Sequence, residues 1–286
     1  MRLVLVHGRS QEGKDSQALK RVWMDGLIVG LEAAGLGGID AHEVVFPFYG
    51  DDLAAMVAEI HETVDDAVTY KGGDADAAPL DGTQVELLQE VLTDGEIAFE
   101  TEGRVTHKGL MNTALAHALA RAADRTSFGH NFLKVWTEDV ALYLSNRAVA
   151  RRIDDRVQAS IGDQPCVVVA HSLGSIVAYR VLRAMGRAAR VRRLITIGSP
   201  LGLQTVRNLL SPPVRTFPEG VESWVNAFDV KDIVALHPLD AKTWPVDPPI
   251  TNHAGVANHM DNHHNISGYL DDPYIAAAIH EALNSV

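Results

Sequence analysis

Residues 166–175 read Cys-Val-Val-Val-Ala-His-Ser-Leu-Gly-Ser, an apolar strand-like run that leads directly into a helix-like segment. Small residues stand two positions before and two positions after Ser172, at Ala170 and Gly174. A sharp strand-to-helix turn brings the backbone so close to its neighbours at these positions that larger side chains would collide. The pattern predicts a strained turn that lifts the Ser172 hydroxyl above the sheet as a nucleophile.

Two details qualify this motif. Alanine stands at position 170 where glycine is more usual, and it is still small enough for the turn. The plainer interpretation is a serine that caps an ordinary helix. The strand before Ser172 and the helix after it favour the nucleophile, because the helix N-terminus stabilises negative charge that develops there.

The segments on both sides of this motif alternate between strand-like and helix-like hydrophobic periods. Strands are expected at Leu3–Val6, His42–Tyr49, Cys166–Ala170, Leu194–Ile197 and Trp224–Phe228. Helices are expected at Ser16–Ala34, Ser145–Ile161 and Ser175–Arg187. This alternation predicts an α/β fold, with a mostly parallel sheet flanked by helices.

The middle of the chain has a different pattern. Residues 51–144 are helical and irregular in character, with an alanine-rich stretch at Leu115–Ala123 and a glycine-punctuated loop around Lys71–Gly82. We therefore expect a core formed by residues 1–50 and 145–286, and a helical cap inserted at residues 51–144.

Composition narrows the possible partners. The 286 residues are 47% hydrophobic, enough for one sizeable core, and a formal net charge of −12 argues against nucleic acid as a partner. The single cysteine, Cys166, excludes an intrachain disulfide. The apolar run at the N-terminus is too short for a signal peptide or a membrane span, so we expect a cytoplasmic protein without membrane insertion. The sequence does not indicate an oligomeric state.

A nucleophilic serine needs a base, and the base needs a carboxylate that orients it. Asp229 and Asp232 both follow the expected strand Trp224–Phe228. We prefer Asp232, because the apolar residues after it can pack back into the core and hold it rigidly, and Asp229 is the alternative. The carboxylate that is not used is expected to cap a turn or a helix.

The base is expected on the polar loop that precedes the C-terminal helix. This loop contains His259, His263 and His264. His264 is the first choice because it lies closest to the apolar residues that anchor the loop, with His263 second and His259 third.

An oxyanion hole needs two backbone N–H groups that converge on one point. Leu173, directly after the nucleophile, should supply one of them. The other should come from the loop after the first strand, where Gly8 lets the backbone approach a ligand closely, and we expect Arg9 to be this donor. An ordinary turn at the end of the strand is the alternative for His7-Gly8.

Several of these segments together carry a family resemblance. They are Leu3–Ser10, Ala170–Ser175, Ile195–Leu201, Asp232–Val234 and His264–Leu270. They resemble the lipase and esterase branch of the α/β-hydrolase family, and residues 51–144 lie outside the resemblance, where such families commonly carry a variable cap.

The resemblance implies acyl-enzyme chemistry on a small acyl ester, without a cofactor or a metal ion. In this chemistry Ser172 attacks, His264 relays the proton and Asp232 orients the imidazole. The cap would set the acyl-chain size. Four aromatic residues are candidate pocket walls, or else ordinary core: Trp23, Phe46, Phe48 and Trp136.

A nucleotide-binding protein is one alternative. Residues 8–15 read Gly-Arg-Ser-Gln-Glu-Gly-Lys-Asp and nearly match a phosphate-binding loop. The last position differs, because the motif needs a Ser or Thr hydroxyl for Mg²⁺ and Asp15 would place a carboxylate beside the phosphates.

Two further alternatives concern the same candidate residues. A metal site could be built from His253, His259, Asp261, His263 and His264. Their spacing fits no tight metal-binding template, so a histidine-rich loop is the plainer interpretation. A hydrolase fold that serves only as an interaction scaffold is also possible, although an intact trio of serine, histidine and aspartate argues against it.

Overall fold

The computed structural model describes residues 1–8, 13–39, 42–69, 82–94, 130–210, 215–235 and 237–285. Six strands form one parallel sheet in the order β2-β1-β3-β4-β5-β6. Their bounds are β1 (Arg2–Val6), β2 (Glu43–Val45), β3 (Cys166–His171), β4 (Val191–Ile197), β5 (Trp224–Ala227) and β6 (Thr251–His253). The predicted α/β class, a parallel sheet flanked by helices, is confirmed.

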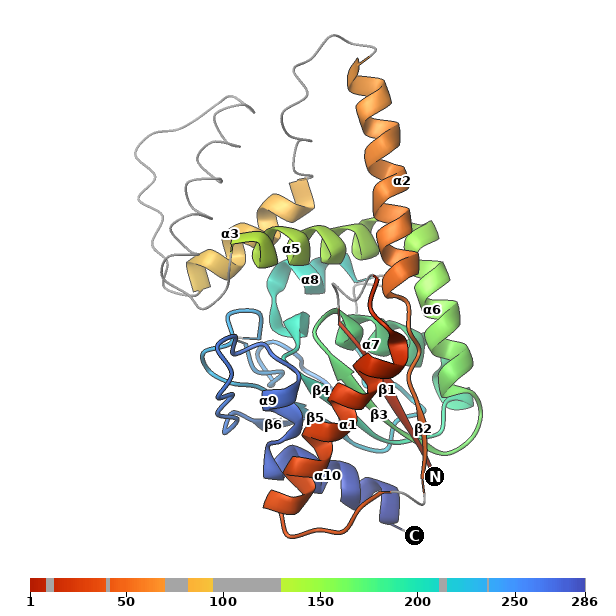
Figure 1. Cartoon of the computed structure of the whole chain (residues 1–286), viewed down its shortest axis with the longest axis vertical. Coiled ribbons are helices and arrows are strands. Elements are labelled where there is room, and N and C mark those ends of the chain that lie inside the picture. Colours follow the sequence, from red (N-terminus) through yellow and green to blue (C-terminus); the bar gives the residue numbers. More distant parts are fainter. Residues whose placement is uncertain are drawn as a thin grey trace.

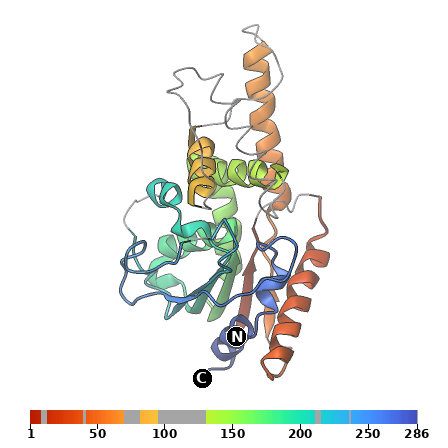
Figure 2. The ribbon, with the colours of Figure 1, turned by 90° about the vertical axis from the view of Figure 1, so that its left-hand side faces the viewer.

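Helices cover both faces of this sheet (Figures 1 and 2). One face is covered by α1 (Ser16–Ala33), α9 (Ser267–Leu270) and α10 (Pro273–Asn284). The other is covered by α6 (Arg147–Ile161) and α7 (Leu173–Met185). Short 3-10 turns lie at Gly186–Ala188 and Pro200–Gly202, and α8 (Gln204–Leu209) follows the second of them. Within the described part of the chain, no helix has both the length and the apolar composition needed to cross a bilayer.

The central strand shows why the sheet is covered on both sides. All six residues of β3 are buried, as expected for a strand between two layers of helices. Because side chains alternate along a strand, Val167 and Val169 pack with α1 and α10, whereas Val168 packs in the cluster on the opposite face. The sheet thus separates two apolar layers.

Three further helices come from residues 50–145: α2 (Gly50–Thr69), α3 (Gly82–Asp94) and α5 (His130–Ser145). They lie beyond the carboxyl ends of the strands (Figure 1), and the buried side chains of α3 and α5 join the apolar cluster on the α7 face of the sheet. The alanine-rich stretch Leu115–Ala123 and nearly all of the glycine-punctuated loop lie outside the described residues. The division into core and cap stays a prediction.

Several element boundaries differ from those expected. The strand predicted at His42–Tyr49 ends at Val45, since Pro47 lacks the N–H that a strand ladder needs. The helix expected at Ser145–Ile161 is divided at Asn146, whose side chain accepts hydrogen bonds from Ala148 N and Val149 N and so starts α6. β4 begins earlier than predicted, at Val191.

The strand order places a crevice at the carboxyl ends of the neighbouring strands β1 and β3. The chain leaves β1 through α1 on one face and leaves β3 through α7 on the other, so the loops after these two neighbouring strands diverge. Ligands bind to open α/β sheets at such a reversal of strand order, at the carboxyl ends of the strands. A cavity of about 620 Å³ lies here, and both Gly8 and Ser172 line it.

Candidate active site

Ser172 has an unusual backbone conformation. Its φ of 56° and ψ of −131° make it the only non-glycine residue with positive φ in the described part of the chain. Such a conformation costs on the order of 1–3 kcal/mol and persists only where its surroundings enforce it. At Gly174 a Cβ atom would lie 2.4 Å from the carbonyl oxygens of both Val6 and His7, so the small residue in the motif lets α7 pack against the end of β1.

The Ser172 side chain opens onto the cavity. The side chain lines the cavity, and its Oγ makes no hydrogen bond with any described residue. The Leu173 N–H, the first predicted oxyanion donor, opens α7 directly after it. The loop after β1 also closes on the serine, because a Cβ atom on Gly8 would lie 2.8 Å from Ser172 Cβ. Arg9, the second predicted donor, lies outside the described residues.

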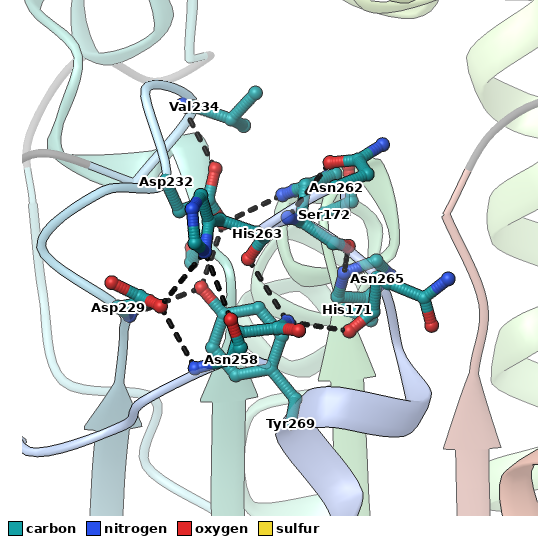
Figure 3. A network of polar contacts seen from close by, with 12 residues as sticks. His171, Ser172, Asp229, Asp232, Val234, Asn258, Asn262, His263, Asn265 and Tyr269 are labelled. Atoms are coloured by element: carbon teal, nitrogen blue, oxygen red, sulfur yellow. Dashed lines mark hydrogen bonds and ion pairs between the residues drawn. The ribbon is translucent and has the colours of Figure 1, made fainter. Parts of the chain in front are cut away.

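The structure brings the side chains of Asp232 and His264 together. His264 Nδ1 donates a hydrogen bond of 2.7 Å to Asp232 Oδ2, and both side chains are buried. Asp232 also accepts from Val234 N at 3.0 Å and from Tyr269 Oη at 2.7 Å (Figure 3). The carboxylate is therefore held by three donors and fixes the imidazole with its proton on Nδ1. His264 lines the same cavity as Ser172.

Asp229 and His263, the alternative candidates for the carboxylate and the base, make different contacts. Asp229 accepts from Lys231 N and Asn258 N, both at 2.8 Å. His263 Nδ1 lies 2.9 Å from the Asn258 carbonyl oxygen and 3.4 Å from Asp229 (Figure 3). These contacts tie the histidine-bearing loop to the turn after β5, and neither residue lines the cavity.

The sequence analysis missed two side chains that support the site. His171 Nε2 donates to the His264 carbonyl oxygen at 3.0 Å, and the two rings lie 4.6 Å apart. Burial, and next the charge of His264, hold the pKa of His171 well below its usual value, so His171 is neutral. Burial, and next the charge of Asp232, hold the pKa of Tyr269 well above its usual value, so its hydroxyl remains a donor. The sequence could have indicated His171, because this residue directly precedes Ser172.

His7 holds the loop that follows β1. Its Nδ1 donates to the Gly8 carbonyl oxygen at 2.6 Å, and its Nε2 accepts from Tyr49 N at 3.1 Å. The Tyr49 hydroxyl donates to the carbonyl oxygen of His7. Burial is the main reason that the pKa of His7 falls to about 4, so the imidazole is neutral. Its hydrogen bonds with Tyr49 hold the end of β1 against the start of α2.

This buried imidazole predicts a pH-dependent stability. The folded protein excludes the proton that the unfolded chain binds, so His7 lowers the unfolding free energy as the pH falls from 6.5 towards 4. A difference of about 2.5 between the two pKa values corresponds to roughly 3 kcal/mol. We expect urea unfolding to show that the unfolding free energy falls more between pH 7 and pH 4 in the wild type than in His7→Gln. His171 is present in both proteins, so an identical pH dependence would contradict this role of His7.

The cavity has an apolar wall and a polar wall. The residues that line it are Gly8, Lys14, Asp15, Ala18, Leu19, Val22, Trp23, Phe132, His171, Ser172, Asn262, His264, Asn265, Ile266 and Ser267. Of the four aromatic candidates for pocket walls, Trp23 lines the cavity. Phe46 and Phe48 instead pack around His7, with ring centroids 5.4 and 5.3 Å from it. Trp136 is fully buried in the core.

The geometry gives no support to the nucleotide alternative. The Asp15 side chain accepts from Gln17 N at 2.8 Å and caps α1. Gly13 N donates to Asp51 Oδ1 at 2.8 Å. The Asp51 carboxylate therefore occupies a backbone N–H group at which a phosphate-binding loop would hold its anion. Residues 9–12 lie outside the described residues.

The histidines proposed for a metal site do not converge. Each faces a different carboxylate: His253 with Asp272, His259 with Asp271, His263 with Asp229 and His264 with Asp232. Among the residues that the structure describes, no group of three or more His, Cys, Asp or Glu side chains could hold a metal ion.

No protein-family model matches this chain, and no curated protein matches its sequence. The chemistry of the site is therefore inferred from its own geometry.

Proposed function

We propose that this protein is a serine hydrolase that cleaves carboxylic esters through an acyl-enzyme intermediate. The observation that carries the proposal is the 2.7 Å hydrogen bond between His264 Nδ1 and Asp232, in a cavity that His264 shares with the strained Ser172. The three residues come from the carboxyl ends of β3 and β5 and from the loop before α9, so separate elements of a rigid sheet bring them together. The order Ser, Asp, His along the chain matches the order expected for this chemistry on an α/β sheet.

In the acylation step, Ser172 Oγ attacks the carbonyl carbon of the ester while His264 Nε2 takes the hydroxyl proton. The new C–O bond places a negative charge on the carbonyl oxygen. The Leu173 N–H and the loop that contains Arg9 would stabilise this charge. The imidazolium, oriented by Asp232, then gives its proton to the alcohol oxygen as the C–O bond to the alcohol breaks.

Water completes the cycle. His264 Nε2 takes a proton from a water molecule, whose oxygen attacks the acyl carbon. The tetrahedral intermediate collapses, the proton returns to Ser172 Oγ, and the carboxylic acid leaves. Besides the ester and water, the reaction needs no oxidant, reductant or further substrate.

We further propose that the α/β sheet is a variant of the α/β-hydrolase fold. The loops after β1, β3 and β5, and the loop before α9, carry residues in the roles that this fold assigns. Sheets of that fold are normally mixed, whereas the six strands described here are all parallel. On this interpretation, α2, α3 and α5 would form the cap, and Phe132 of α5 brings it to within 5.7 Å of the His264 ring.

Covalent labelling tests the proposal directly. We expect a p-nitrophenyl alkylphosphonate to release one equivalent of p-nitrophenol and to add one phosphonyl group to Ser172, because only an activated serine displaces this leaving group rapidly. Intact-mass measurement and peptide mapping would locate the adduct. A protein that stays unlabelled, or labelling at a serine other than Ser172, would contradict the proposed nucleophile.

A further inference from the structure

Two asparagines flank His264 on the polar wall of the cavity. Asn262 Oδ1 accepts a hydrogen bond from His264 N at 2.9 Å, and Asn265 Oδ1 accepts from Ser267 N at 2.9 Å. The backbone joins the two positions, because Asn265 N donates to the Asn262 carbonyl oxygen at 2.9 Å. Each bond fixes which end of the amide is the oxygen, so both Nδ2 groups are turned away from the backbone.

These two Nδ2 groups are donors that the described residues do not use. Neither nitrogen donates to a described residue, although both side chains line the cavity and are partly exposed. In Figure 3 both side chains point away from the contacts around Asp229 and His263. Two N–H donors beside the proposed base are therefore oriented for a ligand.

The part of the lining that α1 contributes has a different chemistry. Leu19, Val22 and Trp23, here called the α1 wall, are apolar and offer no hydrogen-bond acceptor, and the Asp15 carboxylate lines the cavity at the start of the helix. A ligand that fills the cavity would therefore meet apolar carbon on one side and amide donors on the other. A substrate with an apolar part and an oxygen-bearing part matches both walls.

The mechanism decides which part of the ester meets which wall. His264 must protonate the oxygen of the departing alcohol, so this alcohol lies beside His264 when the ester bond breaks. The asparagines on both sides of His264 consequently face the alcohol, which leaves the α1 wall to the acyl chain.

We infer that Asn262 and Asn265 select esters whose alcohol carries additional acceptor oxygens, such as ether, hydroxyl or carbonyl oxygens, and that the acyl chain is apolar. This inference rests on the proposed function. It assigns specificity to two residues that take no part in proton transfer.

Two matched esters test the inference. In 2-(2-methoxyethoxy)ethyl butyrate the alcohol has two ether oxygens that accept but do not donate, and n-heptyl butyrate has the same chain length without them. Asn262→Asp and Asn265→Asp keep the oxygen that accepts from the backbone and replace the donor by an acceptor. We expect each substitution to lower the ratio of kcat/KM for the ether ester to that for the alkyl ester by about five- to tenfold, as a lost hydrogen bond implies.

The ratio cancels any change in the basicity of His264, because both esters depend on it equally. Asn146→Asp is the matched control, since Asn146 likewise accepts from backbone N–H groups but does so at the start of α6, and it should leave the ratio unchanged. Ser172-dependent hydrolysis with an unchanged ratio in both asparagine variants would overturn the inference alone. Hydrolysis that persists in Ser172→Ala would overturn the proposed function, and the inference with it.

Discussion

Replacement of Ser172 by alanine is expected to lower kcat for ester hydrolysis by about 10⁶-fold, the loss seen when a triad nucleophile is removed from a serine hydrolase. The reason is that Ser267, the other serine among the described residues that line the cavity, lies at the start of α9 and not on the strained turn after β3, so it cannot take over. Hydrolysis of p-nitrophenyl esters from acetate to palmitate measures the effect.

Ser160→Ala is the control, because Ser160 Oγ only donates to the Arg156 carbonyl oxygen on α6. It should hydrolyse every ester at the wild-type rate. The wild-type profile of rate against chain length would then size the cavity. If Ser172→Ala and the wild type hydrolysed the esters equally, the activity would not belong to this site.

Apolar periodicity predicted the central part of the fold well. The strand expected at Cys166–Ala170 extends by only one residue, and the helix expected at Ser16–Ala34 ends one residue earlier. β6, at Thr251–His253, was missed because its sequence is polar and short. Its middle residue, Asn252, bonds with Asn226 and with the backbone around Leu239, and such long-range side-chain contacts leave no periodic signal.

The sequence analysis named the candidate site residues but not the contacts that support them. The sequence placed Asp229 and Asp232 after the same strand, three positions apart, and side-chain direction alone distinguishes them. That direction depends on Tyr269 and Asn258, which approach from distant parts of the chain. The sequence analysis preferred Asp232 because of the apolar residues that follow it, whereas contacts with such distant residues leave no local pattern in the sequence.

On the proposed function, Asp232→Asn is expected to lower kcat by about 10⁴-fold, as the same change does in a well-studied Ser-His-Asp protease. An amide at this position can present its NH₂ group to His264 Nδ1, which favours the tautomer that has its proton on Nε2. This tautomer cannot accept the proton of Ser172. The loss should appear in kcat with little change in KM, because Asp232 is fully buried and does not line the cavity.

Asp229→Asn is the matched comparison, since it makes the same chemical change three residues away. The Asp229 side chain accepts hydrogen bonds from the backbone N–H groups of Lys231 and Asn258. This variant should therefore lose roughly 1–3 kcal/mol of stability and keep kcat within about tenfold of the wild type. Steady-state kinetics and urea unfolding on both variants separate the two roles. A larger loss of kcat in Asp229→Asn than in Asp232→Asn would assign the orienting carboxylate to Asp229. It would also mean that His263, which lies 3.4 Å from Asp229, replaces His264 as the base.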